Sequence, residues 1–125
     1  MILLSKEQIL LLHKRLIERY GGTYGVRDEG LLDSALNAPF QSFGGEDFFP
    51  SIPDKAVRLC IGLVTNHPFH DGNKRIGALA MLTMLDLNHI LLNTSSAELA
   101  DVVLKLAAVE IDDSTFLQWV TDRIE

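Results

Sequence analysis

The stretch from Asn73 to about Asn88 is the feature that most limits what this chain can fold into. It is apolar nearly all round rather than on one face, and a helix with that pattern has to be surrounded by other parts of the protein. Gly77, Ala78 and Ala80 keep one side of it small, so neighbouring helices can approach closely. The stretch therefore predicts a buried central helix.

Signals for the ends of helices recur along the rest of the chain. Serine, aspartate and proline stand where helices are expected to begin, and a glycine pair or a proline where they are expected to end. The expected starts are capping boxes at Ser5 and Ser95, an N-cap at Asp28, Pro53 in a first turn, and a cap at Asp113 or Ser114; the expected stops are Gly21-Gly22 and Pro39. No stretch shows sustained polar–apolar alternation, and Ile90 to Asn93 is only a weak strand candidate. The sequence predicts an all-α fold of about six helices.

Length and composition indicate one domain with its own core. Compact domains most often have about 100 to 150 residues, so the 125 residues are expected to form a single domain over 1–125. Hydrophobic residues make up 47% of the chain, which is enough for a core without disulfides. The one cysteine, Cys60, lies in an apolar run and is expected to be a small core residue rather than a reactive thiol.

Charge and targeting signals narrow the class of protein. The net charge of −6 argues against nonspecific nucleic-acid binding, which requires a basic face. The longest apolar runs fall far short of the ~20 residues that span a membrane. Charged residues follow Met1 to Leu4 at once, which is not the pattern of a signal peptide. The expectation is a soluble, cytoplasmic protein with no membrane or nucleic-acid partner.

The segment from Pro39 to Ile52 departs from the helical pattern. It is rich in glycine, proline and phenylalanine, with Phe43, Phe48 and Phe49 around Gly44-Gly45. A loop with three phenylalanines either folds back onto the core or lies over a cleft as a flap. The sequence favours packing but leaves both open, because a loop anchored by aromatic side chains can also border a site.

Polar residues gather most densely between His67 and Arg75, directly before the apolar helix. Gly72-Asn73 falls where the loop becomes helix, and the first amide groups of a helix bind phosphate or carboxylate; Asn73 is also a good N-cap. Lys74 and Arg75 oppose the helix dipole, at a cost of about 0.3–1 kcal/mol each, unless an anion lies there. Solvation or pairing with acidic residues is the alternative. An anion site fits better, because Lys74 supplies a point charge and Arg75 a fork for two phosphate oxygens.

Asp71 and His67 add chemistry to that anion site. One carboxylate with phosphate oxygens and waters is the usual way to hold Mg²⁺, although Asp71 could instead cap the helix. His67 either closes the preceding helix or lies within reach of a group that reacts at the anion, where histidine is the best available general base for a hydroxyl. A zinc site that adds His70 is disfavoured, because the spacing is not helical. The remaining histidines, His13 and His89, are far off in the sequence.

The pattern His67-x-Phe69-x-Asp71-Gly72-Asn73-Lys74-Arg75 resembles the active-site motif of the Fic/Doc family, and most closely its Doc (death-on-curing) toxin branch. Phe69 is expected to anchor the loop in the core. Supporting segments are Tyr20-Gly21-Gly22, Gly25 to Leu32 and Ser95 to Ala100, so the resemblance covers essentially the whole chain. It implies a compact Fic/Doc-type helical domain. The roles that it implies are base for His67, Mg²⁺ ligand for Asp71, phosphate cradle for Gly72 and Asn73, and phosphate clamp for Arg75.

Two departures from the common Fic motif bear on the activity. Lys74 replaces a glycine, and Ala78 the final arginine, of most AMP-transferring members, whereas Doc-type proteins share the lysine. The resemblance therefore implies a Doc-like kinase that uses ATP and Mg²⁺ to phosphorylate a Ser or Thr hydroxyl of an elongation factor Tu-like target and so arrests translation. The alternatives are an adenylyltransferase with a degenerate motif and a catalytically silent binding module.

The resemblance also implies a partner that restrains the toxin. The family's inhibitory helix has the pattern [ST]-x-x-x-E-[GN]. In this chain Thr94-x-x-x-Glu98 is followed by Leu99 instead, and the segment is better explained by the capping box. Restraint is therefore expected from a Phd-like antitoxin in trans. Such a segment is expected to lay an amphipathic helix into an apolar groove near residues 40–49.

Overall fold

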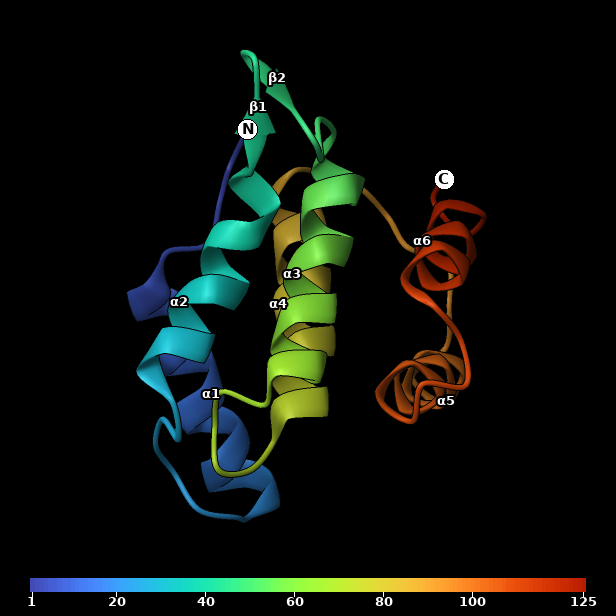
Figure 1. Ribbon diagram of the computed structural model, residues 1–125. Coiled ribbons are helices and arrows are strands. Elements are labelled where there is room, and N and C mark those ends of the chain that lie inside the picture. Colours follow the sequence, from blue (N-terminus) through green and yellow to red (C-terminus); the bar gives the residue numbers. More distant parts are fainter.

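The computed structural model describes the whole chain, Met1–Glu125, and confirms the all-α prediction. Six α-helices, one turn of 3₁₀-helix and one short hairpin make up the fold (Figure 1). The elements are α1 (Lys6–Tyr20), α2 (Glu29–Asn37), the 3₁₀ turn η1 (Ala38–Phe40), β1 (Ser42–Phe43), β2 (Glu46–Asp47), α3 (Ile52–Asn66), α4 (Asn73–Leu87), α5 (Ser96–Ala107) and α6 (Asp113–Thr121). No helix is long and apolar enough to cross a membrane.

Side-chain caps begin five of the six α-helices, and most of them stand where the sequence predicts. The side chains of Ser5, Asp28 and Ser95 accept hydrogen bonds from backbone N–H groups three residues further on, as predicted. The cap of α6 is Asp112, one residue before the predicted pair. Ser51 caps α3 and forms a capping box with Asp54. The sequence predicted only a helix start near Pro53 and missed this cap. These caps satisfy amide groups that have no partner inside the helix.

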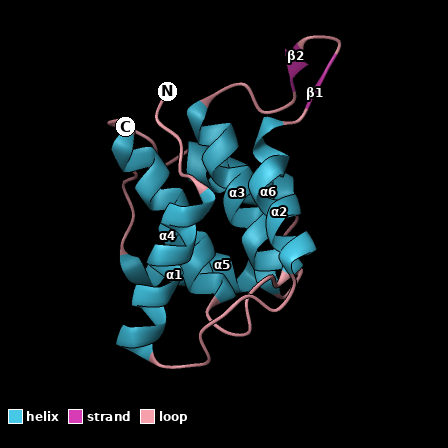
Figure 2. Ribbon diagram, turned by 90° about the vertical axis from the view of Figure 1, so that its left-hand side faces the viewer, coloured by secondary structure: helices cyan, strands magenta, loops and turns pink.

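The centre of the molecule is a pair of helices, α3 and α4, rather than α4 alone. The two lie side by side (Figures 1 and 2), and Figure 1 shows α1 and α2 on one flank of the pair and α5 and α6 on the other. A Cβ atom on Gly77 of α4 would lie 2.7 Å from Cγ2 of Val64 and 3.2 Å from the carbonyl oxygen of Cys60, both on α3. The predicted close approach at the small side of α4 is thus confirmed. Cys60 is a buried core residue, and burial raises the pKa of its thiol to about 12.

The segment between α2 and α3 forms a hairpin that stands away from the predicted site. Strands β1 and β2 pair antiparallel, with Phe43 opposite Glu46. Phe43 and Phe48 are 80% and 59% exposed, so the prediction that the phenylalanines pack onto the core is wrong for these two. Both ribbon views place the hairpin beyond the N-terminal end of α3, at the opposite end from the loop that starts at His67 (Figures 1 and 2). Fifteen helical residues span about 22 Å, so the hairpin is not a flap over residues 67–75.

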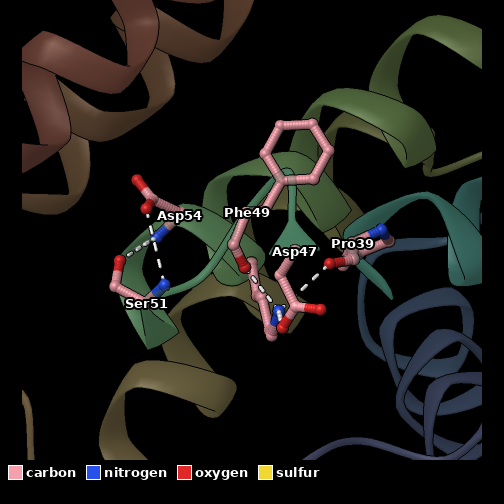
Figure 3. A network of polar contacts seen from close by, with 6 residues as sticks. Pro39, Asp47, Phe49, Ser51 and Asp54 are labelled. Carbon is pink, nitrogen blue, oxygen red and sulfur yellow. Dashed lines mark hydrogen bonds and ion pairs between the residues drawn. The ribbon is translucent and has the colours of Figure 1, made fainter. Parts of the chain in front are cut away.

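A buried lysine fastens this hairpin to α3. The ammonium group of Lys55 donates hydrogen bonds to the carbonyl oxygens of Pro39 and Phe49 and pairs with the carboxylate of Asp47 at 3.3 Å. Figure 3 shows these partners converging from both sides of the hairpin, next to the Ser51–Asp54 capping box. A buried charge is tolerated only when it is paired and fully hydrogen-bonded. The network therefore gives the short hairpin a fixed position that two-residue strands could not hold alone.

The weak strand candidate near residue 90 forms no strand. Leu92 makes only an isolated antiparallel bridge to Ile124, which joins the connection before α5 to the end of the chain. A single bridge lacks the neighbouring strands that stabilise a sheet. The segment is therefore a connection, in agreement with the all-α class.

We predict that replacing Gly77 with Ala destabilises the protein although alanine is the better helix former. The added methyl group meets Val64 at 2.7 Å, and overpacking of this kind costs about 1–3 kcal/mol. The matched control is Gly30→Ala in α2, where the nearest atom is 3.4 Å away and helix propensity favours alanine by about 1 kcal/mol. Urea denaturation should show a loss for the first variant and no loss for the second. Equal stability of Gly77→Ala and wild type would contradict the close helix contact.

Candidate active site

The predicted site residues lie on the connection between α3 and α4 and on the first turn of α4. His67 ends α3 with a left-handed backbone, φ 53° and ψ 51°. Gly72 precedes α4, also left-handed, with φ 78° and ψ 17°. These two reversals turn the chain from one helix into the antiparallel next one within six residues. Between them Phe69 is 1% exposed, which confirms it as the anchor of the loop.

Asn73 holds the loop from within and does not cap α4. Its Oδ1 accepts a hydrogen bond from the N–H of Phe69, and its Nδ2 donates to the carbonyl oxygen of Phe69, both at 3.0 Å. The alternative role of Asn73 as an N-cap is therefore excluded. The N-cap is Gly72, because the left-handed turn into α4 favours glycine and leaves Asn73 as the first helical residue. The amide is buried and its carbonyl–amide orientation is fixed by the two backbone partners.

The same amide also fixes the ring of His67. Asn73 Nδ2 lies 2.9 Å from Nδ1 of His67. Since Nδ2 donates to Phe69, it is a donor here too, and Nδ1 accepts. The neutral ring therefore carries its proton on Nε2. His67 as a whole is an exposed residue.

A second loop, between α1 and α2, is hydrogen-bonded to the first. The side chain of Arg27 donates to the carbonyl oxygens of Asn66 and His67, at 3.2 and 2.8 Å. Asn66 is the last residue of α3, and His67 is its C-cap. The N–H of Thr23 donates to Oδ2 of Asp71 at 2.6 Å. A Cβ atom on Gly22, whose φ is +110°, would lie 3.0 Å from Cβ of Asp71. The glycine-rich segment that supports the family resemblance is thus the outer wall of the site.

His13 is a site residue that sequence reasoning missed. It comes from α1, is fully buried, and its Nε2 lies 2.7 Å from the carbonyl oxygen of Asp71. Its ring stacks on that of Phe69, with centroids 3.7 Å apart. Burial lowers the pKa of His13, against an opposing effect of the hydrogen bond and charge of Asp71. Its distance along the sequence hid this contact, and a histidine at an otherwise apolar helical position was the only available signal.

The first turn of α4 has the properties of an anion site. Among the six α-helices only α4 has no side-chain cap, so its first amide groups keep their hydrogen-bonding capacity. Lys74 and Arg75 are exposed and form no ion pair, which leaves the alternative of pairing with acidic residues without support. The guanidinium carbon of Arg75 lies 4.5 Å from the ring centroid of Tyr20. Positive charge and free donors therefore coincide at this helix end.

Asp71 is a suitable carboxylate ligand for a magnesium ion that also binds a phosphate. Its carboxylate is exposed, and only Oδ2 has a hydrogen-bonding partner. No group of three or more His, Cys, Asp or Glu side chains is placed to hold a metal ion by itself. Magnesium often takes one carboxylate and completes its shell with waters and substrate phosphates. The donor set therefore fits a magnesium ion that arrives with a nucleotide.

Comparison with known proteins agrees with this geometry. The family model described as "Fic/DOC family" matches residues 3–85, which include α1 to α3, all but the last two residues of α4, and both loops of the site. The chain belongs to the Fic/DOC family. Protein kinase doc of Escherichia phage P1 is 30% identical over 112 residues, covering 90% of this chain and 87% of that protein. Toxin Doc of Mycolicibacterium smegmatis is 42% identical over 71 residues, covering 57% of this chain and 55% of that protein.

We predict that Asn73→Ala destabilises the protein more than Asn66→Ala does. Asn73 makes three hydrogen bonds, two of them to buried backbone groups, whereas the Nδ2 of Asn66 makes one, to the carbonyl oxygen of Leu31. Leaving a buried donor and acceptor unpaired costs about 1–3 kcal/mol each, against about 0.5–1.5 kcal/mol for one ordinary bond. Chemical denaturation of both variants measures the difference. A smaller loss for Asn73→Ala than for Asn66→Ala would contradict the role of the amide in holding the loop.

Proposed function

We propose that this chain is a Doc-like toxin that transfers the terminal phosphate of ATP to a Ser or Thr hydroxyl of a target protein. The observation that carries the proposal is the uncapped first turn of α4, with two unpaired cations, next to an exposed histidine whose ring is held by Asn73. The names of the two relatives, a toxin and a protein kinase, support it. An elongation factor Tu-like target, and hence translation arrest in the cytoplasm, completes the proposal.

Each site residue has a defined task in this reaction. The amide groups at Gly72 and Asn73 and the side chains of Lys74 and Arg75 bind phosphate oxygens, whose negative charge they balance. Asp71 would hold Mg²⁺, which neutralises phosphate charge when it is bound with ATP. Phosphoryl transfer needs little covalent help from the protein, so positioning and charge stabilisation supply most of the catalysis.

His67 would receive the proton of the target hydroxyl. The hydroxyl oxygen forms a bond to the terminal phosphorus, the bond from that phosphorus to ADP breaks, and ADP leaves with the electron pair. In the structure, Nδ1 of His67 accepts from Asn73 and the proton of the neutral ring is on Nε2. We therefore include in the proposal a turn of the exposed ring that frees Nδ1 for the hydroxyl when the target binds. The turn breaks the hydrogen bond from Asn73, and His67 is an exposed residue.

A partner in trans is part of the proposal. An antitoxin segment that docks on the hairpin would meet the exposed rings of Phe43 and Phe48, which offer a rigid apolar contact. The hairpin and His67 are separated by the length of α3 (Figure 1). A segment that also covers His67 therefore has to run along α3 for about 22 Å, which is about 15 residues as a helix or about 7 as a strand.

We predict that the wild-type chain labels a protein in a bacterial lysate from γ-labelled ATP and not from α-labelled ATP. His67→Ala should lower the labelling by about 10²–10⁴-fold, because that is the usual contribution of a general base. His70→Ala, two residues beyond Pro68 and exposed as well, is the matched control and should keep most of the activity. Label from the α-position would replace phosphate transfer by AMP transfer. No label from either position would leave only the binding module.

We predict that Arg75→Ala weakens the binding of ATP with Mg²⁺ by about 10- to 100-fold, since hydrogen bonds to charged groups contribute about 1.5–3 kcal/mol. Arg123→Ala is the control. Arg123 also lies over an aromatic ring, that of Trp119, at 4.0 Å, but it follows α6 rather than α3. Calorimetry should show wild-type affinity for Arg123→Ala. Equal affinity of Arg75→Ala and wild type would rule out the phosphate clamp.

We predict that expression of the intact chain alone, from a tightly controlled promoter, arrests bacterial growth. Nothing in this chain covers His67, which is exposed, so restraint has to come from another molecule. His67→Ala, expressed to the same level, should be harmless. Harmless high-level expression of the wild-type chain would contradict both the toxin and the need for a partner.

A further inference from the structure

His13 is a polar residue at a position where the fold requires only an apolar one. It lies on α1 with no exposed surface, among core residues. One ring face stacks on Phe69 at 3.7 Å, with 12° between the ring planes. A phenylalanine would make the same stack without placing polar atoms in the core. The imidazole therefore has a task that packing does not explain.

The ring of His13 makes one hydrogen bond, to a backbone atom of the loop between α3 and α4. Its Nε2 lies 2.7 Å from the carbonyl oxygen of Asp71. A carbonyl oxygen only accepts, so Nε2 is the donor and Nδ1 is the bare nitrogen of a neutral ring. Nδ1 is buried and has no partner. The structure thus tolerates an unsatisfied acceptor in the core to keep one directional bond to Asp71.

That bond sets the plane of the peptide that leads into α4. The carbonyl of Asp71 and the N–H of Gly72 belong to one planar trans peptide, in which they point in opposite directions. Because His13 holds the carbonyl toward α1, the N–H of Gly72 points away from α1. Gly72 itself lies against the ring, since a Cβ atom there would be 3.6 Å from Nε2 of His13. The left-handed turn at Gly72 and the direction of the first free amide group are therefore fixed from α1.

We propose that His13 is a positioning residue for the anion site, whose neutral imidazole aims the Asp71–Gly72 peptide so that its N–H faces the bound phosphate. The inference deepens the proposed function and rests on it for the identity of the anion. His13 touches no substrate. It acts through a single bond to the loop that carries Asp71, Gly72 and the start of α4.

Two variants separate the bond from the packing. His13→Phe keeps the ring that stacks on Phe69 and removes the donor. His13→Gln keeps a donor at the distance of Nε2 and removes the ring. Phe116→Leu, in the core on α6 and on the far side of α3, is a control for general destabilisation (Figure 1). Thermal melts establish that each protein is folded.

The first readout is backbone motion, which does not depend on any activity. In wild type and His13→Gln the ¹⁵N order parameters of Gly72 and Asn73 should be those of rigid backbone, near about 0.85. In His13→Phe they should fall below about 0.6, while Phe116→Leu leaves them unchanged. The second readout is the affinity for inorganic phosphate and for ATP with Mg²⁺, which should fall at least tenfold in His13→Phe and less than threefold in His13→Gln.

Each outcome decides the proposal. A rigid loop with wild-type affinity in His13→Phe would overturn it, and so would equal losses in His13→Gln and His13→Phe, because packing alone would then explain the residue. If His13→Phe does not fold, His13→Asn, whose shorter amide does not reach Asp71, takes its place. Unfolding of both while His13→Gln folds would show a role in the whole fold and overturn the local one. If wild type binds neither phosphate nor ATP, the proposed function fails, and the order parameters still decide the positioning.

Discussion

The close contact of α3 and α4 at Gly77 is the constraint on which the rest of the structure depends. A methyl group there would already collide with Val64, so the two central helices lie closer together than a side chain at position 77 would allow. The chain passes from one to the other in six residues, with left-handed backbone at His67 and Gly72. The reversal brings the C-terminal end of one helix beside the N-terminal end of the next. The chemistry of the site follows from that meeting of helix ends, because the second one is positive and uncapped.

A loop with two unusual backbone turns needs support from outside itself, and two other parts of the chain supply it. The loop between α1 and α2 contributes Arg27 and Thr23, which bond the end of α3 and the carboxylate of Asp71. The helix α1 contributes His13, which holds the carbonyl of Asp71 from the core side. With Asn73 bridging the inside of the loop, the backbone at the anion site is held on three sides. A phosphate that binds there meets donors that are already in place, so little ordering has to accompany binding.

The sequence predicted most of the helices, and it named residues that the structure brings together between the end of α3 and the first turn of α4, because both depend on local patterns. Capping boxes at Ser5 and Ser95, and the apolar run after Asn73, are signals within a few residues. The failures concern contacts between distant residues. Asn73 is a good N-cap by its neighbours, yet the turn at Gly72 directs its amide back to Phe69. His13 lies 58 residues from Asp71, and Phe43 and Phe48 are exposed because Lys55, not aromatic packing, fastens the hairpin. No local sequence pattern predicts these contacts between distant residues.

We propose that the first turn of α4 is the phosphate site of this protein. The most direct measurement is a ¹H–¹⁵N NMR titration of the wild-type chain with inorganic phosphate, followed at every assigned backbone amide. We expect the largest shifts at Gly72, Asn73, Lys74 and Arg75, and we expect these shifts to saturate together with one dissociation constant. The amides that follow the caps of the other five α-helices should move little, because side chains already occupy them. Shifts that are spread evenly over the helix ends, or absent from residues 72–75, would contradict it.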